Sequence, residues 1–98
     1  MAMTYIDRIA NQIRDALPPK DRPGEHAEEL YRLYALLVLT TGEATTLENV
    51  HDAWSTWMTA HQPHHESIRP FRQLDAGTRN EDRPYLNAIR SIAATHRK

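Results

Sequence analysis

The apolar segment LYRLYALLVLTT, residues 30–41, constrains the fold of this chain more than any other stretch. At 100° per residue, Leu30 and Val38 lie on one face of a helix, while Leu36 and Leu39 carry apolar surface round to the opposite side. A helix with this pattern is buried around most of its circumference, so it needs packing partners on more than one side. The sequence therefore predicts that this helix lies at the centre of a compact helical body.

The first two helices have recognisable ends. Thr4 stands three residues before Asp7, which predicts a capping box at the start of a first helix, and Pro18 ends that helix. A proline-rich connector leads to the central helix, which is expected to begin near Glu25 and to end at Gly42 as a C′ glycine. Both segments are long enough to be main helices of the fold.

Two further helices are predicted in the second half of the chain. Thr45 and Glu48 have the spacing of a capping box, which places the start of a third helix there and its end near His61. Asp82, with Pro84 just inside, is a good start for the last helix.

The segment QPHHESIRPFRQL, residues 62–74, lies between these two helices and has no sustained periodicity. Its apolar residues Ile68, Phe71 and Leu74 predict an ordered loop that is pinned to the third helix. No strand-like alternation occurs in the chain. We therefore expect an all-α fold, a compact bundle of four main helices with a long ordered loop between helices three and four, in a single domain over residues 1–98.

Charge and composition narrow the class of partner. The chain has 12 Lys and Arg against 13 Asp and Glu, a net charge of -1, and this balance creates no global field that would gather nucleic acid or anionic lipid. There is no cysteine, so the fold must stand without disulfides or thiolate metal sites. The N-terminal segment is amphipathic, and Arg32 interrupts the only long apolar run. We expect a cytoplasmic protein that binds neither nucleic acid nor membranes.

One short stretch gathers possible metal ligands, His61, His64, His65 and Glu66. Imidazole and carboxylate groups bind Zn²⁺, but protein metal sites usually draw ligands from two elements, and this stretch matches no metal-binding motif. No Gly-rich phosphate loop, nucleophile elbow or spaced pair of carboxylates occurs in the chain. We therefore expect no metal, no cofactor and no enzymatic activity.

The second half of the chain also carries a longer pattern in three segments. They read Val50-His51-Asp52-x-Trp54 on the third helix, His65-Glu66-x-Ile68-x-Pro70-Phe71-x-x-Leu74 in the loop, and Asp82-Arg83 ahead of the helix that holds Ile89. In this order they resemble the ryanodine-receptor (RyR) domain, over about residues 47–93. The resemblance implies a small helical module that serves interaction or ligand sensing. The whole chain is also similar to small uncharacterised proteins of actinobacteria and their phages.

These observations predict a non-enzymatic helical binding module, a phage or bacterial regulatory protein that binds a protein partner. The candidate binding residues lie in the loop, at the edge of the third helix and around the nearby arginines: Trp57, His65, Arg69, Phe71, Arg72, Arg83 and Tyr85. Two alternatives stay open. One is a sensor of a small phosphorylated, nucleotide-like ligand, and the other is a self-associating structural protein, such as a homodimer, that uses apolar surface left over on the second helix.

Overall fold

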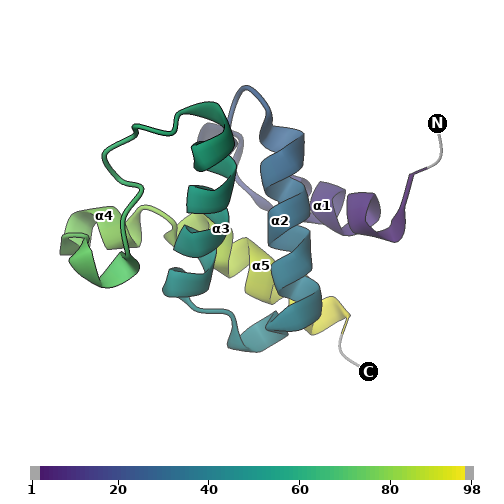
Figure 1. The fold of residues 1–98 in the computed structure, drawn as a ribbon. Coiled ribbons are helices and arrows are strands. Elements are labelled where there is room, and N and C mark those ends of the chain that lie inside the picture. The colour runs from purple at the N-terminus through teal and green to yellow at the C-terminus, as the bar shows by residue number, and fades with distance from the viewer. Residues whose placement is uncertain (1–2, 97–98) are drawn as a thin grey trace.

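The fold, seen in a computed structural model that describes residues 3–96, is all-α in this range (Figure 1). Three short 3-10 turns lie at Pro19–Asp21, Gly42–Ala44 and Phe71–Gln73. Four helices of 12 to 15 residues form the body, and a fifth has 5 residues: α1 (Tyr5–Ala16), α2 (Ala27–Thr40), α3 (Leu47–His61), α4 (Ala76–Asn80) and α5 (Arg83–Thr95). The predicted fold class and the four main helices are confirmed, and α4 is the short turn that connects the loop to α5.

Local side-chain hydrogen bonds fix where α1 and α3 begin. In α1 the capping box is the predicted one, because the Thr4 side chain accepts from the Asp7 backbone and the Asp7 side chain accepts from Thr4. In α3 the prediction was wrong by one residue, since the N-cap is Thr46 and its partner is Asn49. Thr45 is instead fully buried, and its hydroxyl bonds the Gly42 carbonyl oxygen at 2.7 Å.

The two ends of α2 are formed differently. At the C-terminal end, Gly42 adopts φ 58°, the left-handed conformation expected of a C′ glycine. At the N-terminal end the helix begins at Ala27, two residues later than expected, behind a left-handed His26 that makes no side-chain cap. His26 is held from α3, because Trp57 Nε1 donates to its carbonyl oxygen at 2.9 Å and the His61 ring stacks on its ring at 4.3 Å.

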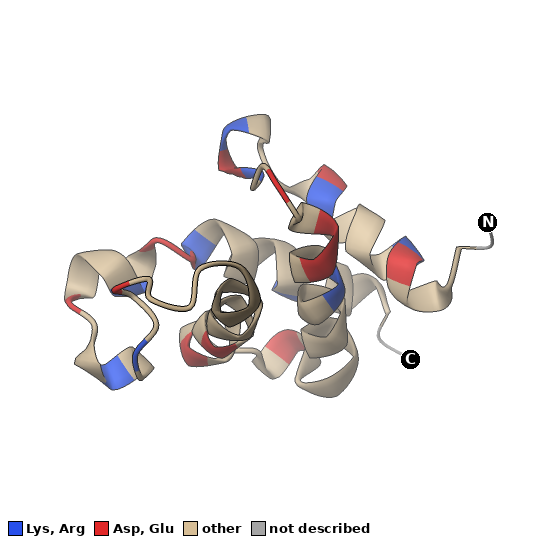
Figure 2. Cartoon of the chain, turned by 45° about the horizontal axis from the view of Figure 1, so that its top comes forward, with Lys and Arg blue, Asp and Glu red and all other residues tan. Residues whose placement is uncertain are grey.

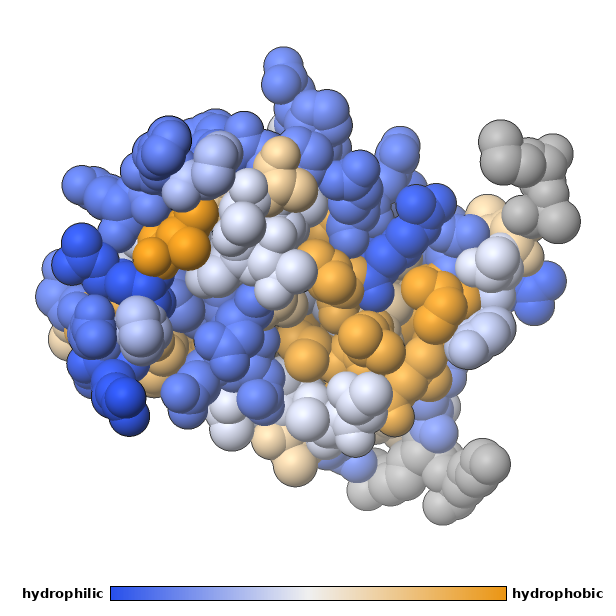
Figure 3. Space-filling view, in the orientation of Figure 1, coloured by the Kyte–Doolittle hydropathy of each residue, from blue (hydrophilic) through white to orange (hydrophobic). Residues whose placement is uncertain are grey.

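The core forms where α1, α3 and α5 all pack against α2 (Figure 1). The fully buried side chains at its centre come from all four main helices and include Ile13, Tyr34, Val50 and Ile89. Leu36 and Leu39 on α2 remain 49% and 45% exposed, so α2 is buried on three sides and not on the fourth. Figure 3 shows apolar surface gathered over this part of the molecule.

Charged residues are interspersed over the helices, and basic and acidic segments alternate in Figure 2. In the part of the chain that the structure describes, no helix combines the length and the apolar character that crossing a membrane requires.

Candidate functional site

A polar cavity of about 240 Å³ opens between α3, the loop that follows it, α4 and the start of α5. We call it the α3–α5 cavity. Side chains from each of these elements line it: His51, Trp54, His65, Ser67, Thr78, Glu81, Asp82 and Tyr85. The elements are far apart in sequence, so the cavity exists only because the loop is folded back over α3.

His51 holds the loop in place. It is 3% exposed, and its Nε2 lies 2.7 Å from the Arg69 carbonyl oxygen in the loop. A carbonyl oxygen can only accept a hydrogen bond, so Nε2 carries the proton, and in the neutral ring Nδ1 is then the acceptor. The Phe71 ring lies 6.2 Å from the His51 ring, and Leu74 is buried, so the loop is pinned as the sequence predicted.

Two aromatic contacts build the next wall of the cavity. The Trp54 ring stacks against His51 with centroids 5.7 Å apart, and the His65 ring meets Trp54 edge-on at 5.1 Å. His65 Nδ1 accepts from the Ser67 backbone N–H at 3.1 Å, which leaves Nε2 as the protonated nitrogen. Both imidazoles are therefore held in defined tautomers by backbone groups.

Asp82 is the most unusual residue of the cavity. It occupies the N-cap position of α5, yet its side chain makes no capping hydrogen bond and has no hydrogen-bond or ion-pair partner among the described residues. The pKa of this carboxyl is raised from 3.8 to about 6, because the effect of burial outweighs the lowering by His51, and the charge of Glu81 adds a smaller increase. The cavity thus contains a carboxylate that has lost part of its hydration and gained no partner in return.

Tyr85 lines the cavity and contacts Tyr34, which belongs to the core. Tyr85 O–H donates to the Asp21 carbonyl oxygen at 2.7 Å, and burial, followed by the charge of Asp82, raises its pKa to about 12. The Tyr34 ring lies 5.4 Å from the Tyr85 ring, and its buried hydroxyl has no hydrogen-bond partner in the described chain. Burial also raises the pKa of Tyr34 well above its usual value, so both phenols stay neutral.

The structure brings together some of the predicted binding residues. His65 and Tyr85 line the α3–α5 cavity. The Phe71 ring contacts the ring of His51, which lines the cavity, and the Arg69 carbonyl oxygen accepts a hydrogen bond from His51 Nε2. The Arg69 side chain itself lines a neighbouring cavity of about 330 Å³.

The other predicted residues lie elsewhere. Trp57 is occupied in fixing the start of α2, as described above. Arg83 bonds Asn80 and lines a different cavity, and Arg72 is exposed, its carbonyl oxygen accepting from Arg79. These residues do not form one site with His65 and Tyr85.

Sequence reasoning missed the two central residues, His51 and Asp82, as members of a site. Asp82 is predicted as a helix start, and both Asp82 and Trp54 belong to the three-segment pattern, but neither is among the predicted binding residues. The available signal was the three-segment pattern, because His51, Trp54, His65 and Asp82 all belong to it and all line this cavity.

The histidine-rich stretch is not gathered into one cluster. His61 Nε2 lies 2.6 Å from Glu29 Oε2, whereas His65 lies against Trp54. Within residues 3–96, no group of three or more His, Asp or Glu side chains has a geometry that could hold a metal ion.

Comparisons with known proteins give a family and no function. No curated protein and no solved structure matches the chain. One family model, described as a domain of unknown function (DUF7701), matches residues 4–94, a range that includes every residue of the α3–α5 cavity. The chain belongs to this DUF7701 family.

Proposed function

We propose that this protein is a non-enzymatic, cytoplasmic binding module, and that the α3–α5 cavity receives a cationic side chain of a protein partner. The observation that carries the proposal is the Asp82 carboxyl, which is largely buried and has no partner among the described residues. The convergence of His51, Trp54, His65 and Asp82 supports the RyR-like interpretation, because the residues that carry the resemblance then share one task.

The charge of the cavity supports a cationic guest. Among the described residues, its lining includes Glu81 and Asp82 and no Lys or Arg. A buried carboxylate is costly unless an opposite charge or hydrogen-bond donors compensate it, and an arriving ammonium or guanidinium would supply both. The lining also includes the aromatic residues Trp54 and Tyr85, whose rings attract the same kind of group through cation–π interactions.

The size of the cavity supports a single inserted side chain. A volume of about 240 Å³ equals that of roughly eight water molecules, which suits the head group of an Arg or Lys and part of its stem. One anchor of this kind, set in a desolvated pocket, often dominates the energy of a protein interface.

The hydrogen bonding of the two histidines supports a role without catalysis. His51 uses Nε2 on the loop backbone and His65 uses Nδ1 on Ser67 N–H, so each ring is committed to structure on one side. The Ser55 hydroxyl lies 3.3 Å from His51 Nε2, but that nitrogen already donates its proton to the Arg69 carbonyl oxygen, so it cannot act as the base that would activate the serine.

A phosphorylated ligand is a second candidate, favoured by the neighbouring cavity. That cavity shares Ser67 and Thr78 with the α3–α5 cavity and brings in the exposed Arg69. Within residues 3–96, the one hydrogen bond of the Arg69 side chain runs from Nε to the Glu66 carbonyl oxygen. A nucleotide would place its base against Trp54 and its phosphate at Arg69. Arg72 and Arg83 would not take part.

Titration of the isotope-labelled protein with N-acetylarginine amide, followed by NMR, tests the proposal. We expect saturable shifts at residues that line the cavity, and Asp82→Asn should weaken the affinity by about tenfold or more, since a charged hydrogen bond is lost. Affinity should also fall as the pH drops through about 6, because Asp82 then becomes protonated.

Asp52→Asn is the matched control, because Asp52 is an exposed carboxylate on the outside of α3. An equal loss of affinity in Asp82→Asn and Asp52→Asn would show that the effect comes from the general surface charge, and it would contradict the proposal. Adenosine monophosphate serves as the competing probe. If it binds and Arg69→Gln abolishes the binding while N-acetylarginine amide does not bind, the second candidate replaces the first.

A further inference from the structure

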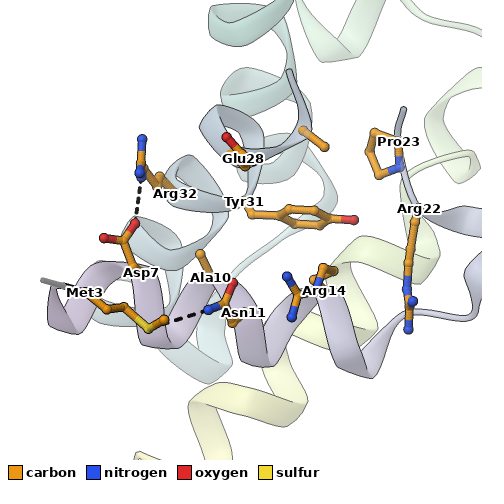
Figure 4. A pocket seen from close by; sticks show the side chains of 11 residues that line it. Met3, Asp7, Ala10, Asn11, Arg14, Arg22, Pro23, Glu28, Tyr31 and Arg32 are labelled. Carbon is orange, nitrogen blue, oxygen red and sulfur yellow. Dashed lines mark hydrogen bonds and ion pairs between the residues drawn. The ribbon is translucent and has the colours of Figure 1, made fainter. Parts of the chain in front are cut away.

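A second hollow lies between α1 and α2, outside the three-segment pattern (Figure 4). It has a volume of about 460 Å³ and is lined by α1, by the connector around Arg22 and Pro23, and by α2. We call it the α1–α2 groove. It shares no residue with the α3–α5 cavity, so the two can be tested separately.

Tyr31 on α2 supplies the central observation. Its side chain is only 5% exposed, and its hydroxyl is buried with no hydrogen-bond partner in the described chain. In Figure 4 the phenol runs along the groove and points toward Pro23 and Arg22, with Arg14 beneath the ring. A buried O–H donor without an acceptor is rare, because the group loses its hydration and gains nothing.

Two arginines lie beside this phenol, and neither can satisfy the O–H, because a guanidinium has no acceptor. Arg14 uses its Nε on the neighbouring Asp15 at 3.1 Å, in an exposed pair that contributes little. Arg22 uses its Nε on the Leu17 carbonyl oxygen at 3.2 Å. The terminal nitrogens of both arginines therefore remain as donors without a partner among the described residues. In Figure 4 Arg14 lies beneath the phenol and Arg22 stands beyond its hydroxyl, so two separate elements place donors at the same end of the groove as Tyr31.

The rest of the groove is different in character. Two small apolar side chains, Ala10 on α1 and Ala27 on α2, also line it. At the far end Asp7 Oδ1 accepts from Arg32 Nε at 2.8 Å, so the carboxylate of Asp7 is already compensated, while Glu28 stands exposed on α2 (Figure 4). The groove thus combines the donors of Tyr31, Arg14 and Arg22 with apolar lining from both helices.

We infer that the α1–α2 groove binds a small phosphate monoester with an apolar body. Its three terminal oxygens accept from the Tyr31 hydroxyl and from Arg14 and Arg22, and its body lies over Ala10 and Ala27. Donors that converge from three side chains match three terminal oxygens better than the two of a carboxylate. The arginine side chains are long and flexible, so they can swing aside to admit the ligand to the buried hydroxyl.

Isothermal titration calorimetry with phenyl phosphate, inorganic phosphate and benzoate tests the inference. Phenyl phosphate should bind with one site per chain and about tenfold or more tightly than either of the other probes, since only it combines three oxygens with an apolar body. Tyr31→Phe and Arg14→Gln should each weaken this binding by about fivefold or more. Tyr31→Phe should not lower the melting temperature, because the hydroxyl has no partner in the free protein.

Arg8→Gln is the control, because Arg8 is an exposed arginine on the same helix and does not line the groove. It should leave the affinity unchanged. Any of three results would overturn the inference: no saturable binding of phenyl phosphate at millimolar concentration, an affinity for benzoate or inorganic phosphate that equals that for phenyl phosphate, or a loss in Arg8→Gln as large as in Arg14→Gln.

Discussion

At the scale of single residues, Asp82 shows two effects in competition. A carboxylate at the first position of a helix is normally stabilised by the helix dipole and by unpaired backbone N–H groups. Here the side chain makes no such bond, and desolvation is the larger effect, because the pKa rises to about 6. The ionised carboxylate of Asp82 therefore lowers the stability of the folded protein near neutral pH. Destabilised groups of this kind are typical of binding sites.

Replacing Asp82 should reveal this cost as a dependence on pH. The folded-state pKa of about 6 lies above the ordinary value of 3.8, so the folded protein holds an extra proton between these values, and stability is lost as the pH rises through that window. Asp82→Asn removes this loss, so the gain in the free energy of unfolding that it brings should be about 1 to 3 kcal/mol larger at pH 7.5 than at pH 3.5. Urea denaturation at the two pH values measures the difference, and an effect independent of pH would show that the carboxyl is not desolvated.

At the scale of elements, the sequence predicted those features that depend on neighbouring residues. The Thr4 and Asp7 box and the C′ glycine Gly42 both depend on residues within a few positions of the helix end. The start of α3 was misplaced because two consecutive threonines both have a suitable partner three residues on, and the choice is made by the burial of Thr45.

The correction at α3 has a measurable consequence. Thr46→Ala should lower the free energy of unfolding by about 1 kcal/mol, as loss of an N-cap does. Glu48→Gln should change it by less than about 0.5 kcal/mol, because Glu48 is exposed and is not the capping partner. Chemical denaturation of both variants checks this prediction. If Glu48→Gln lowered the free energy of unfolding more than Thr46→Ala does, Thr45 and Glu48 would form the capping box after all.

The candidate sites were harder to predict than the helices for the same physical reason. The α3–α5 cavity that holds Asp82 is formed only when α3 and the loop pack against the start of α5. The surroundings of the Tyr31 hydroxyl likewise include Arg14 and Arg22, which come from two other segments of the chain. Such long-range convergence leaves no periodic signal in the sequence. Only the three-segment pattern pointed toward one of the two sites.

At the scale of the whole molecule, one apolar surface is left uncovered by the described residues. Leu36 and Leu39 are exposed on α2, and Figure 3 shows apolar surface gathered on the side of the molecule where α2 lies. This keeps self-association as a further prediction from the sequence, since large exposed apolar patches commonly mark interfaces.

Light scattering after size-exclusion chromatography tests this prediction over a range of protein concentrations. We expect the mass to rise from one chain toward two with concentration, and Leu39→Glu should hold the protein at one chain without unfolding it, because Leu39 is not part of the core. A constant mass of one chain in the unchanged protein would rule out a dimer through this face.

The hydrogen bond from His51 Nε2 to the Arg69 carbonyl oxygen attaches the loop directly to α3, beside the α3–α5 cavity. We therefore expect the ordering of this loop to be coupled to ligand binding in the α3–α5 cavity. We expect a ligand bound in the α3–α5 cavity to slow amide exchange in residues 62–74, and loss of the His51 imidazole to weaken that binding.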